Sequence, residues 1–237
     1  MMQKFGTSVL KAYQSKDAAK VFSMVVSPPP ASVIEQIVPG TPNYEQLFGE
    51  NSKQWKAVSA WDGEFEETVM NYEAYVVLRQ KPSAFGPGNP DVFSCIRLKK
   101  ENGTWHYDTF YIAQQKQVNG PEFSEAEDGS ELHAELNKTT SSVVQAFHQK
   151  DIEKIKALSV AEGPAALRGE SERTVDERLF NSLDMKEIAE WPGTPGKVFL
   201  KDEAKIKFGE SENATHWVQL IKADSGWRLK DIKLDSK

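Results

Sequence analysis

A few polar and aromatic side chains have the chemistry to bind or transform a small molecule. Ser94, Tyr107 and His216 fall on the same alternation as apolar residues in segments typical of β-strands, so we expect them to face an enclosed hollow. A hydroxyl, a phenol and an imidazole can orient a ligand by hydrogen bonds, and an imidazole can also move a proton. The candidate ligand-binding residues are, in full, Tyr13, Trp61, Ser94, Tyr107, Trp191 and His216.

Acid–base catalysis requires an ionisable group whose surroundings shift its pKa, held close to the reacting atoms. The strand positions expected to face the hollows contain no Asp or Glu, although Asp62 beside Trp61 could enter from a loop. We therefore predict no catalytic residue. The inward positions are Ala74, Val76, Leu78, Ser94, Ile96, Leu98, Trp105, Tyr107, Phe110 and Ile112, and then Ala204, Ile206, Phe208, His216, Val218, Leu220, Trp227, Leu229, Ile232 and Leu234.

Metal binding is not expected either. His106, His133, His148 and His216 lie far apart in the sequence without the spacing of metal ligands. The single cysteine, Cys95, can form neither an internal disulfide nor a cysteine cluster. We predict no metal site and no cofactor.

The elements that must position these residues occur twice in the sequence. When the two copies are aligned, Phe147 takes the place of Tyr13, which favours a core role for that tyrosine. His216, alone among apolar neighbours, could equally be a half-buried strand residue without a binding role. The aligned stretches are SVLKAYQSKDAAKV with SVVQAFHQKDIEKI, KAVSAWDG with KEIAEWPG, and SCIRLKKENGTWHYDTFYI with HWVQLIKADSGWRLKDIKL. The simplest explanation is a first domain at residues 1–118, an acidic linker at 119–135 and a second domain at 136–237.

Each copy is expected to begin with helices and to end with antiparallel strands. Val9, Ala12 and Tyr13 have helical spacing, and Asp17 and Asp151 fall where an N-cap would begin a second helix. After Trp61 and Trp191 the apolar period changes to two, which is typical of strands. The apolar parity then reverses near Asp108-Thr109 and Lys230-Asp231, which predicts a one-residue β-bulge in each last strand. The expected fold class is α+β, with two tandem domains of helices packed on a curved antiparallel sheet.

These motifs resemble the NTF2-like superfamily, which includes SnoaL-like and ketosteroid-isomerase-like proteins. The resemblance is carried by KAYQSKD and QAFHQKD in the helical openings, by the central Trp-x-Gly, and by the closing ENGTW and ADSGW turns. It implies a cone-shaped fold with a pocket between the helices and the concave face of the sheet. It also implies that such domains pair through the outer face of the sheet.

The outward strand positions suggest where such pairing would occur. Apolar side chains on the outer face need a cover, because burying several large ones is worth several kcal/mol at about 25 cal/mol per Å². We predict that the two sheets pack against each other or against a second chain. The candidate interface residues are Tyr75, Val77, Tyr111 and Trp217.

Charge and hydropathy limit the other partners. The chain has 237 residues, a formal net charge of −6 and a mean hydropathy of −0.55. The acidic excess lies between residues 119 and 140. The sequence has no basic stripe of the kind that binds nucleic acid, so we predict no nucleic-acid partner. No apolar run is long enough to span a membrane. As written, the chain is predicted to be cytoplasmic, and an exported protein that has lost its signal peptide is the alternative.

Three functions remain open. The leading hypothesis is a non-catalytic protein that binds a small apolar ligand, or a protein partner, through its pockets or its paired sheet faces. The first alternative is a small-molecule isomerase, dehydratase or hydrolase of SnoaL-like type with one active pocket. The second is a structural module of a larger assembly.

Overall fold

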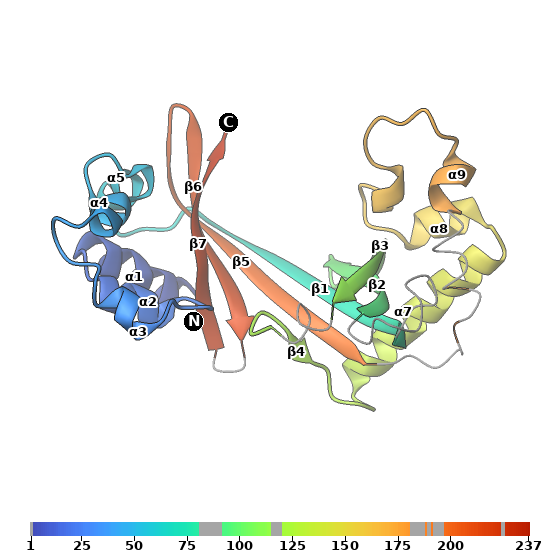
Figure 1. Cartoon of the computed structure of the whole chain (residues 1–237). Coiled ribbons are helices and arrows are strands. Elements are labelled where there is room, and N and C mark those ends of the chain that lie inside the picture. The colour runs from blue at the N-terminus through green and yellow to red at the C-terminus, as the bar shows by residue number, and fades with distance from the viewer. Residues whose placement is uncertain are drawn as a thin grey trace. The chain divides into compact units, whose positions relative to one another are not determined.

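The structure is a computed structural model that describes residues 2–80, 92–114, 120–180, 188, 191, 197–223 and 226–237. Of residues 79, 80, 92 and 111–114 it describes only the backbone. The helices are α1 (Met2–Gln14), α2 (Ala18–Met24), α3 (Ala31–Ile34), α4 (Pro42–Phe48), α5 (Lys53–Ser59), α7 (Glu131–His148), α8 (Ile152–Leu158) and α9 (Val175–Leu179), with a short 3₁₀ turn at Ala165–Leu167 (Figure 1). The strands are β1 (Glu67–Gln80), β2 (Val92–Glu101), β3 (Thr104–Gln114), β4 (Ser124–Glu125), β5 (Val198–Ser211), β6 (Ala214–Ala223) and β7 (Gly226–Ser236).

The α+β class is confirmed, because the described helices pack against an antiparallel sheet of seven strands. Hydrogen bonds connect the strands in the order β3-β2-β1-β5-β6-β7, and β4 pairs with β5. The chain divides into two compact units. Unit 1 comprises Met1–Asn71 and Asp202–Lys237, and unit 2 comprises Tyr72–Lys201.

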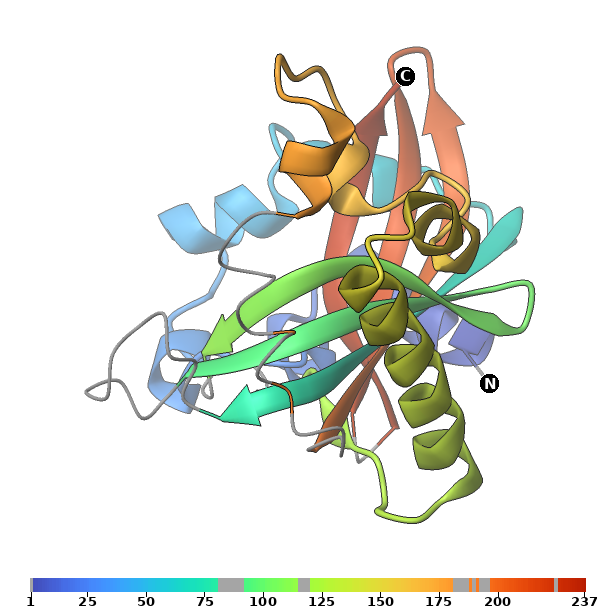
Figure 2. The same ribbon diagram turned by 90° about the vertical axis from the view of Figure 1, so that its right-hand side faces the viewer.

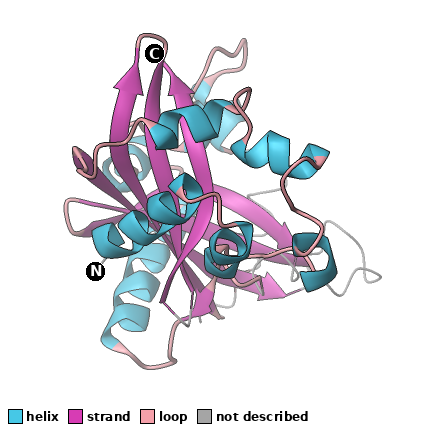
Figure 3. Cartoon of the chain, turned by 90° about the vertical axis from the view of Figure 1, so that its left-hand side faces the viewer, coloured by secondary structure: helices cyan, strands magenta, loops and turns pink. Residues whose placement is uncertain are grey.

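The core of unit 1 lies between helices from the first third of the chain and strands from its end. Val9, Leu10 and Val58 are buried on the helical side. They pack in one cluster with Ile206 and Val218 of β5 and β6. Figure 3 shows these helices crossing in front of the strands.

The core of unit 2 combines the other helices with the other strands. Leu136, Val143 and Phe147 of α7 are buried in one cluster with Ile96 and Leu98 of β2. Figure 2 shows α7 lying across the sheet formed by β1, β2 and β3. Helix α7 also contacts β3 directly.

These units differ from the predicted domains at 1–118 and 136–237. Each unit takes its helices from one predicted copy and most of its strands from the other. Apolar periodicity shows which face of a helix or strand is buried, but not which apolar face covers it. Since the two predicted copies have similar apolar patterns, both pairings would bury similar surfaces.

The predicted linker is also shorter than expected. Helix α7 begins at Glu131, because the Ser130 side chain caps it by accepting a hydrogen bond from the backbone N–H of His133 at 3.2 Å. The Ser and acidic residues that suggested a linker are therefore in part a helix start, where carboxylates are favoured. Before it, β4 pairs with β5 through Ser124 and Leu200.

Several local predictions are confirmed. Asp17 and Asp151 cap α2 and α8, each accepting a backbone N–H bond of 2.9 Å. In the β2–β3 pairing, Leu98 faces Tyr107 and Arg97 faces Thr109, which leaves Asp108 as the bulged residue.

The β6–β7 pairing repeats this bulge. Leu220 faces Leu229 and Gln219 faces Asp231, so Lys230 is the bulged residue there. Both bulges lie where the sequence predicts them, and the register of each strand changes at that point.

None of the described helices has both the length and the hydropathy that crossing a membrane requires.

Candidate ligand-binding site

A pocket of about 600 Å³ opens in unit 1 between α5 and the strands β5, β6 and β7. Its apolar lining includes Ala57 and Ala60 from the helical side and Ala214 and Leu234 from the strands. A volume of this size suits a small organic molecule. The polar lining residues are Lys53, Lys56, Glu210, Ser211, Asn213, His216 and Ser236.

His216 brings the imidazole of β6 into this pocket. A bulge at Phe208 shifts the register of β5, so that Gly209 lies opposite His216. The Phe208 and His216 rings are 5.6 Å apart between centroids. Burial lowers the pKa of His216, and the nearby Glu210 opposes this only in part. The ring is therefore neutral at pH 7 and can both donate and accept a hydrogen bond.

Tyr13 and Trp61 belong to unit 1 but serve its core. The Tyr13 ring packs edge-on against Phe48 at 5.8 Å, and burial with the charge of Asp231 raises the pKa of Tyr13 to about 12. The Trp61 indole donates a hydrogen bond to the carbonyl of Glu64 at 2.5 Å and packs against Phe65. Neither residue is among the described residues that line the pocket.

The other three candidates lie in unit 2. Tyr107 is buried and packs edge-on against Phe147 at 5.5 Å. Ser94 is fully buried in β2, and Trp191 packs against the unit 2 core. The six candidates therefore divide equally between the units, and His216 alone among them lines the described pocket.

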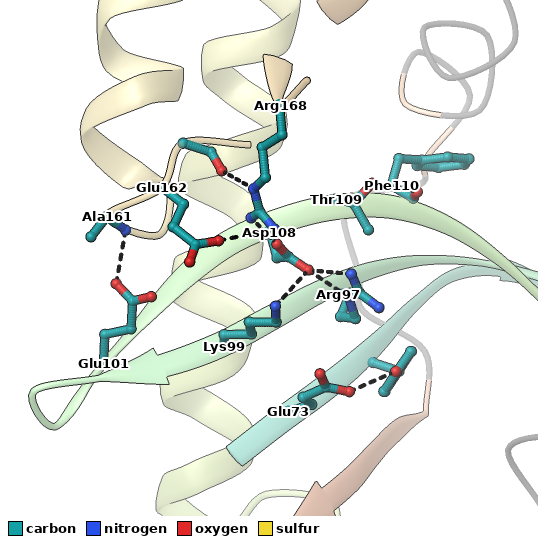
Figure 4. Close-up of polar contacts among 12 residues, drawn as sticks. Glu73, Arg97, Lys99, Glu101, Asp108, Thr109, Phe110, Ala161, Glu162 and Arg168 are labelled. Atoms are coloured by element: carbon teal, nitrogen blue, oxygen red, sulfur yellow. Dashed lines mark hydrogen bonds and ion pairs between the residues drawn. The ribbon is translucent and has the colours of Figure 1, made fainter. Parts of the chain in front are cut away.

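A buried carboxylate that was not among the predicted site residues, Asp108, is surrounded by three cationic side chains (Figure 4). Its Oδ2 accepts a hydrogen bond from Arg97 Nε at 2.6 Å and lies 3.5 Å from Lys99 Nζ. Its Oδ1 accepts a hydrogen bond from Arg168 Nη2. Arg168 follows the 3₁₀ turn, so this ion pair fixes the loop after α8 to the bulge of β3.

The cluster keeps Asp108 ionised. Burial by itself raises the pKa of a carboxyl group, but the charges of Arg97 and Lys99 and the hydrogen bond from Arg168 outweigh it, and the net pKa of Asp108 is lowered. A general acid, or a base that works near pH 7, would need the opposite shift. We therefore assign Asp108 a structural role and not a catalytic one.

The face of the sheet that carries Asp108 follows from strand alternation. Ile96 and Leu98 pack in the core with the helices, so Arg97 and Lys99 point to the opposite face. Asp108 meets those two cations and lies outside the hollow that the helices cover. The bulge was the available sequence signal, because it changes the direction of the side chain at this position.

The outer face in unit 2 is covered by the chain itself. Tyr75 and Val77 have exposed fractions of 6% and 1% and form a small apolar cluster with Phe93, Cys95 and Phe199. The Phe123 ring covers Tyr75 edge-on at 5.3 Å between centroids. These two candidate interface residues are thus unavailable to a second chain. The segment with Phe123 was predicted to be a solvated linker, so the cover of Tyr75 and Val77 was expected from another sheet or a second chain.

Of the other two interface candidates, Trp217 and Tyr111, the structure describes the side chain of Trp217 alone. Trp217 in β6 is partly buried. The backbone of Tyr111 pairs with Cys95, and its side chain lies outside the described residues.

No group of three or more His, Cys, Asp or Glu side chains that could hold a metal ion occurs within the described ranges.

Comparisons of the chain with models of protein families, with curated proteins and with solved structures found no significant match.

Proposed function

We propose that the protein binds a small, largely apolar molecule in the pocket of unit 1 and does not transform it. The observation that carries this proposal is the pocket itself, which combines apolar walls from α5 and β7 with the neutral imidazole of His216. The walls would bury the ligand, and His216 would orient it by one hydrogen bond.

We further infer that the chain consists of two copies of one NTF2-like fold whose helices and sheets are exchanged. Residues at aligned positions support this inference. Lys16 and Lys150 both have positive φ, at 55° and 52°, at the ends of α1 and α7. Asp108 and Lys230 are the bulged residues of the two last strands. In this arrangement the pocket of unit 1 corresponds to the cone pocket of the family.

Two observations favour binding over catalysis. Asp108, the fully buried Asp of the described residues, is held ionised by cations outside the hollow. No described carboxylate forms a hydrogen bond with His216, so the imidazole lacks the partner that usually orients a catalytic histidine.

Fluorescence of N-phenyl-1-naphthylamine, a neutral apolar probe, tests the proposal. Ala60 lines the pocket at the C-terminal end of α5, and a tryptophan there would occupy the cavity. We expect Ala60→Trp to weaken probe binding at least tenfold. Ser59→Trp, at an exposed neighbour outside the pocket lining, is the matched control and should bind as the native protein does. Equal binding by both variants would contradict the proposal.

A further inference from the structure

Two lysines project from one helix at the edge of the pocket. Lys53 and Lys56 are three residues apart on α5, so they lie on the same side of the helix, and both line the pocket. Both are exposed. Neither forms an ion pair with any described residue.

Among the described residues that line the pocket, the one carboxylate is already paired with other cations. Glu210 lies 3.4 Å from Lys207 Nζ and 3.2 Å from Lys237 Nζ. Lys207 also pairs with Glu66 at 2.6 Å. Glu210 therefore pairs with neighbouring lysines of the sheet and not with Lys53 or Lys56.

We propose that the pocket is selective for an anionic apolar molecule, with the apolar body against Ala57, Ala60 and Leu234 and the acid group beside Lys53 and Lys56. This inference rests on the proposed function and adds the ligand class. Since Lys and Arg stems can lie along apolar surface while their charges stay in water, the two ammonium groups can reach an anion at the mouth without entering the apolar cavity.

The expected selectivity is moderate, because the lysines are exposed. One unit charge about 6 Å from another in water changes an affinity about threefold, so two lysines together give about tenfold. The selectivity for an anionic ligand also weakens with salt, since the Debye length falls from about 10 Å at 0.1 M to about 3 Å at 1 M ionic strength.

Two dyes that differ by one sulfonate group separate the charge from the apolar body. They are 1-anilinonaphthalene-8-sulfonate, which is anionic, and N-phenyl-1-naphthylamine, which is neutral. We expect the double substitution Lys53→Gln with Lys56→Gln to weaken binding of the anionic dye about tenfold at low salt and to change binding of the neutral dye less than twofold. The control is Lys4→Gln with Lys11→Gln, which removes the same charge from exposed positions on α1.

Each result bears on one claim. A loss of anionic-dye affinity in the pocket variant alone, which disappears in 1 M NaCl, supports the inference. An equal loss in the α1 control, or no loss in either, overturns it. If the neutral dye still binds Ala60→Trp as it binds the native protein, the proposed pocket function itself fails, whatever the lysine variants do.

Discussion

Val26 donates its backbone N–H to the carbonyl oxygen of Leu229 at 2.9 Å, which joins the end of α2 to the last strand of the chain. The same bond recurs in unit 2, where the N–H of Val160 donates to the carbonyl of Tyr107 at 2.9 Å. Val26 aligns with Val160, and Leu229 aligns with Tyr107, in the sequence. Both units thus attach the segment after their second helix to a strand from the other predicted copy.

This exchange predicts which strands lose protection when a helix is weakened. Leu10→Ala should cost about 3 kcal/mol of stability, since Leu10 is fully buried in the unit 1 core. Hydrogen exchange should speed up in α1 and β7, with β3 unchanged. Leu136→Ala, at a fully buried position of α7 in the unit 2 core, should instead loosen α7 and β3. Loosening of β3 by Leu10→Ala would contradict the exchanged arrangement.

The Asp108 cluster should contribute measurably to stability. Asp108→Asn would leave Arg97, Lys99 and Arg168 without their shared carboxylate, and we expect a loss of about 2–3 kcal/mol, reduced from the buried-pair range because the cations are partly exposed. Urea unfolding measures the difference. Asp62→Asn, at an exposed loop position, should change the free energy of unfolding by less than about 0.5 kcal/mol.

The same cluster sets a pH dependence whose sign follows from the lowered pKa of Asp108. The folded state binds the Asp108 proton less tightly than the unfolded state, in which the pKa is about 3.9. The contribution is therefore complete above that pH and is lost as pH falls through the lower, folded value. The stability difference between the native protein and Asp108→Asn should be constant from pH 6 to 8 and should shrink in acid. A difference that grows in acid would be inconsistent with an ionised Asp108.

Cys95 should be unreactive in the folded protein. Its side chain is fully buried under the apolar cluster of the outer face, and burial raises the pKa of the thiol to about 12. At pH 8 we expect a disulfide reagent such as DTNB to modify Cys95 only after unfolding in guanidinium. Phe123→Ala, which removes the cover of Tyr75, should accelerate the reaction. Rapid stoichiometric modification of the native protein would show that this face is open.

The α+β class, the helix caps and the bulges could be predicted because each depends on residues close together in sequence. Asp17 caps α2 through a bond three residues away, and the bulge at Asp108 appears as a change of parity within one strand. The pairing of helices with sheets depends on contacts between distant segments. Similar apolar faces such as those of Val9 and Val143 do not specify which sheet each will cover.

The candidate site was predicted less completely for a related reason. His216 was identified because its strand parity predicts that it faces the hollow, and it does line the pocket. Lys53 and Lys56 were not singled out, since nothing local distinguishes them from other exposed lysines of a helix. Their position matters because α5 lies over strands near the end of the chain, and the predicted pairing placed it over other strands.

Methyl NMR of the alanines on addition of N-phenyl-1-naphthylamine tests most directly whether the pocket binds an apolar molecule. Ala57, Ala60 and Ala214 line the pocket, whereas Ala12 and Ala146 are buried in the two cores. We predict that the three pocket methyl signals shift together in a saturable way while the two core signals stay in place. Saturable shifts that leave out Ala57, Ala60 and Ala214 would contradict it.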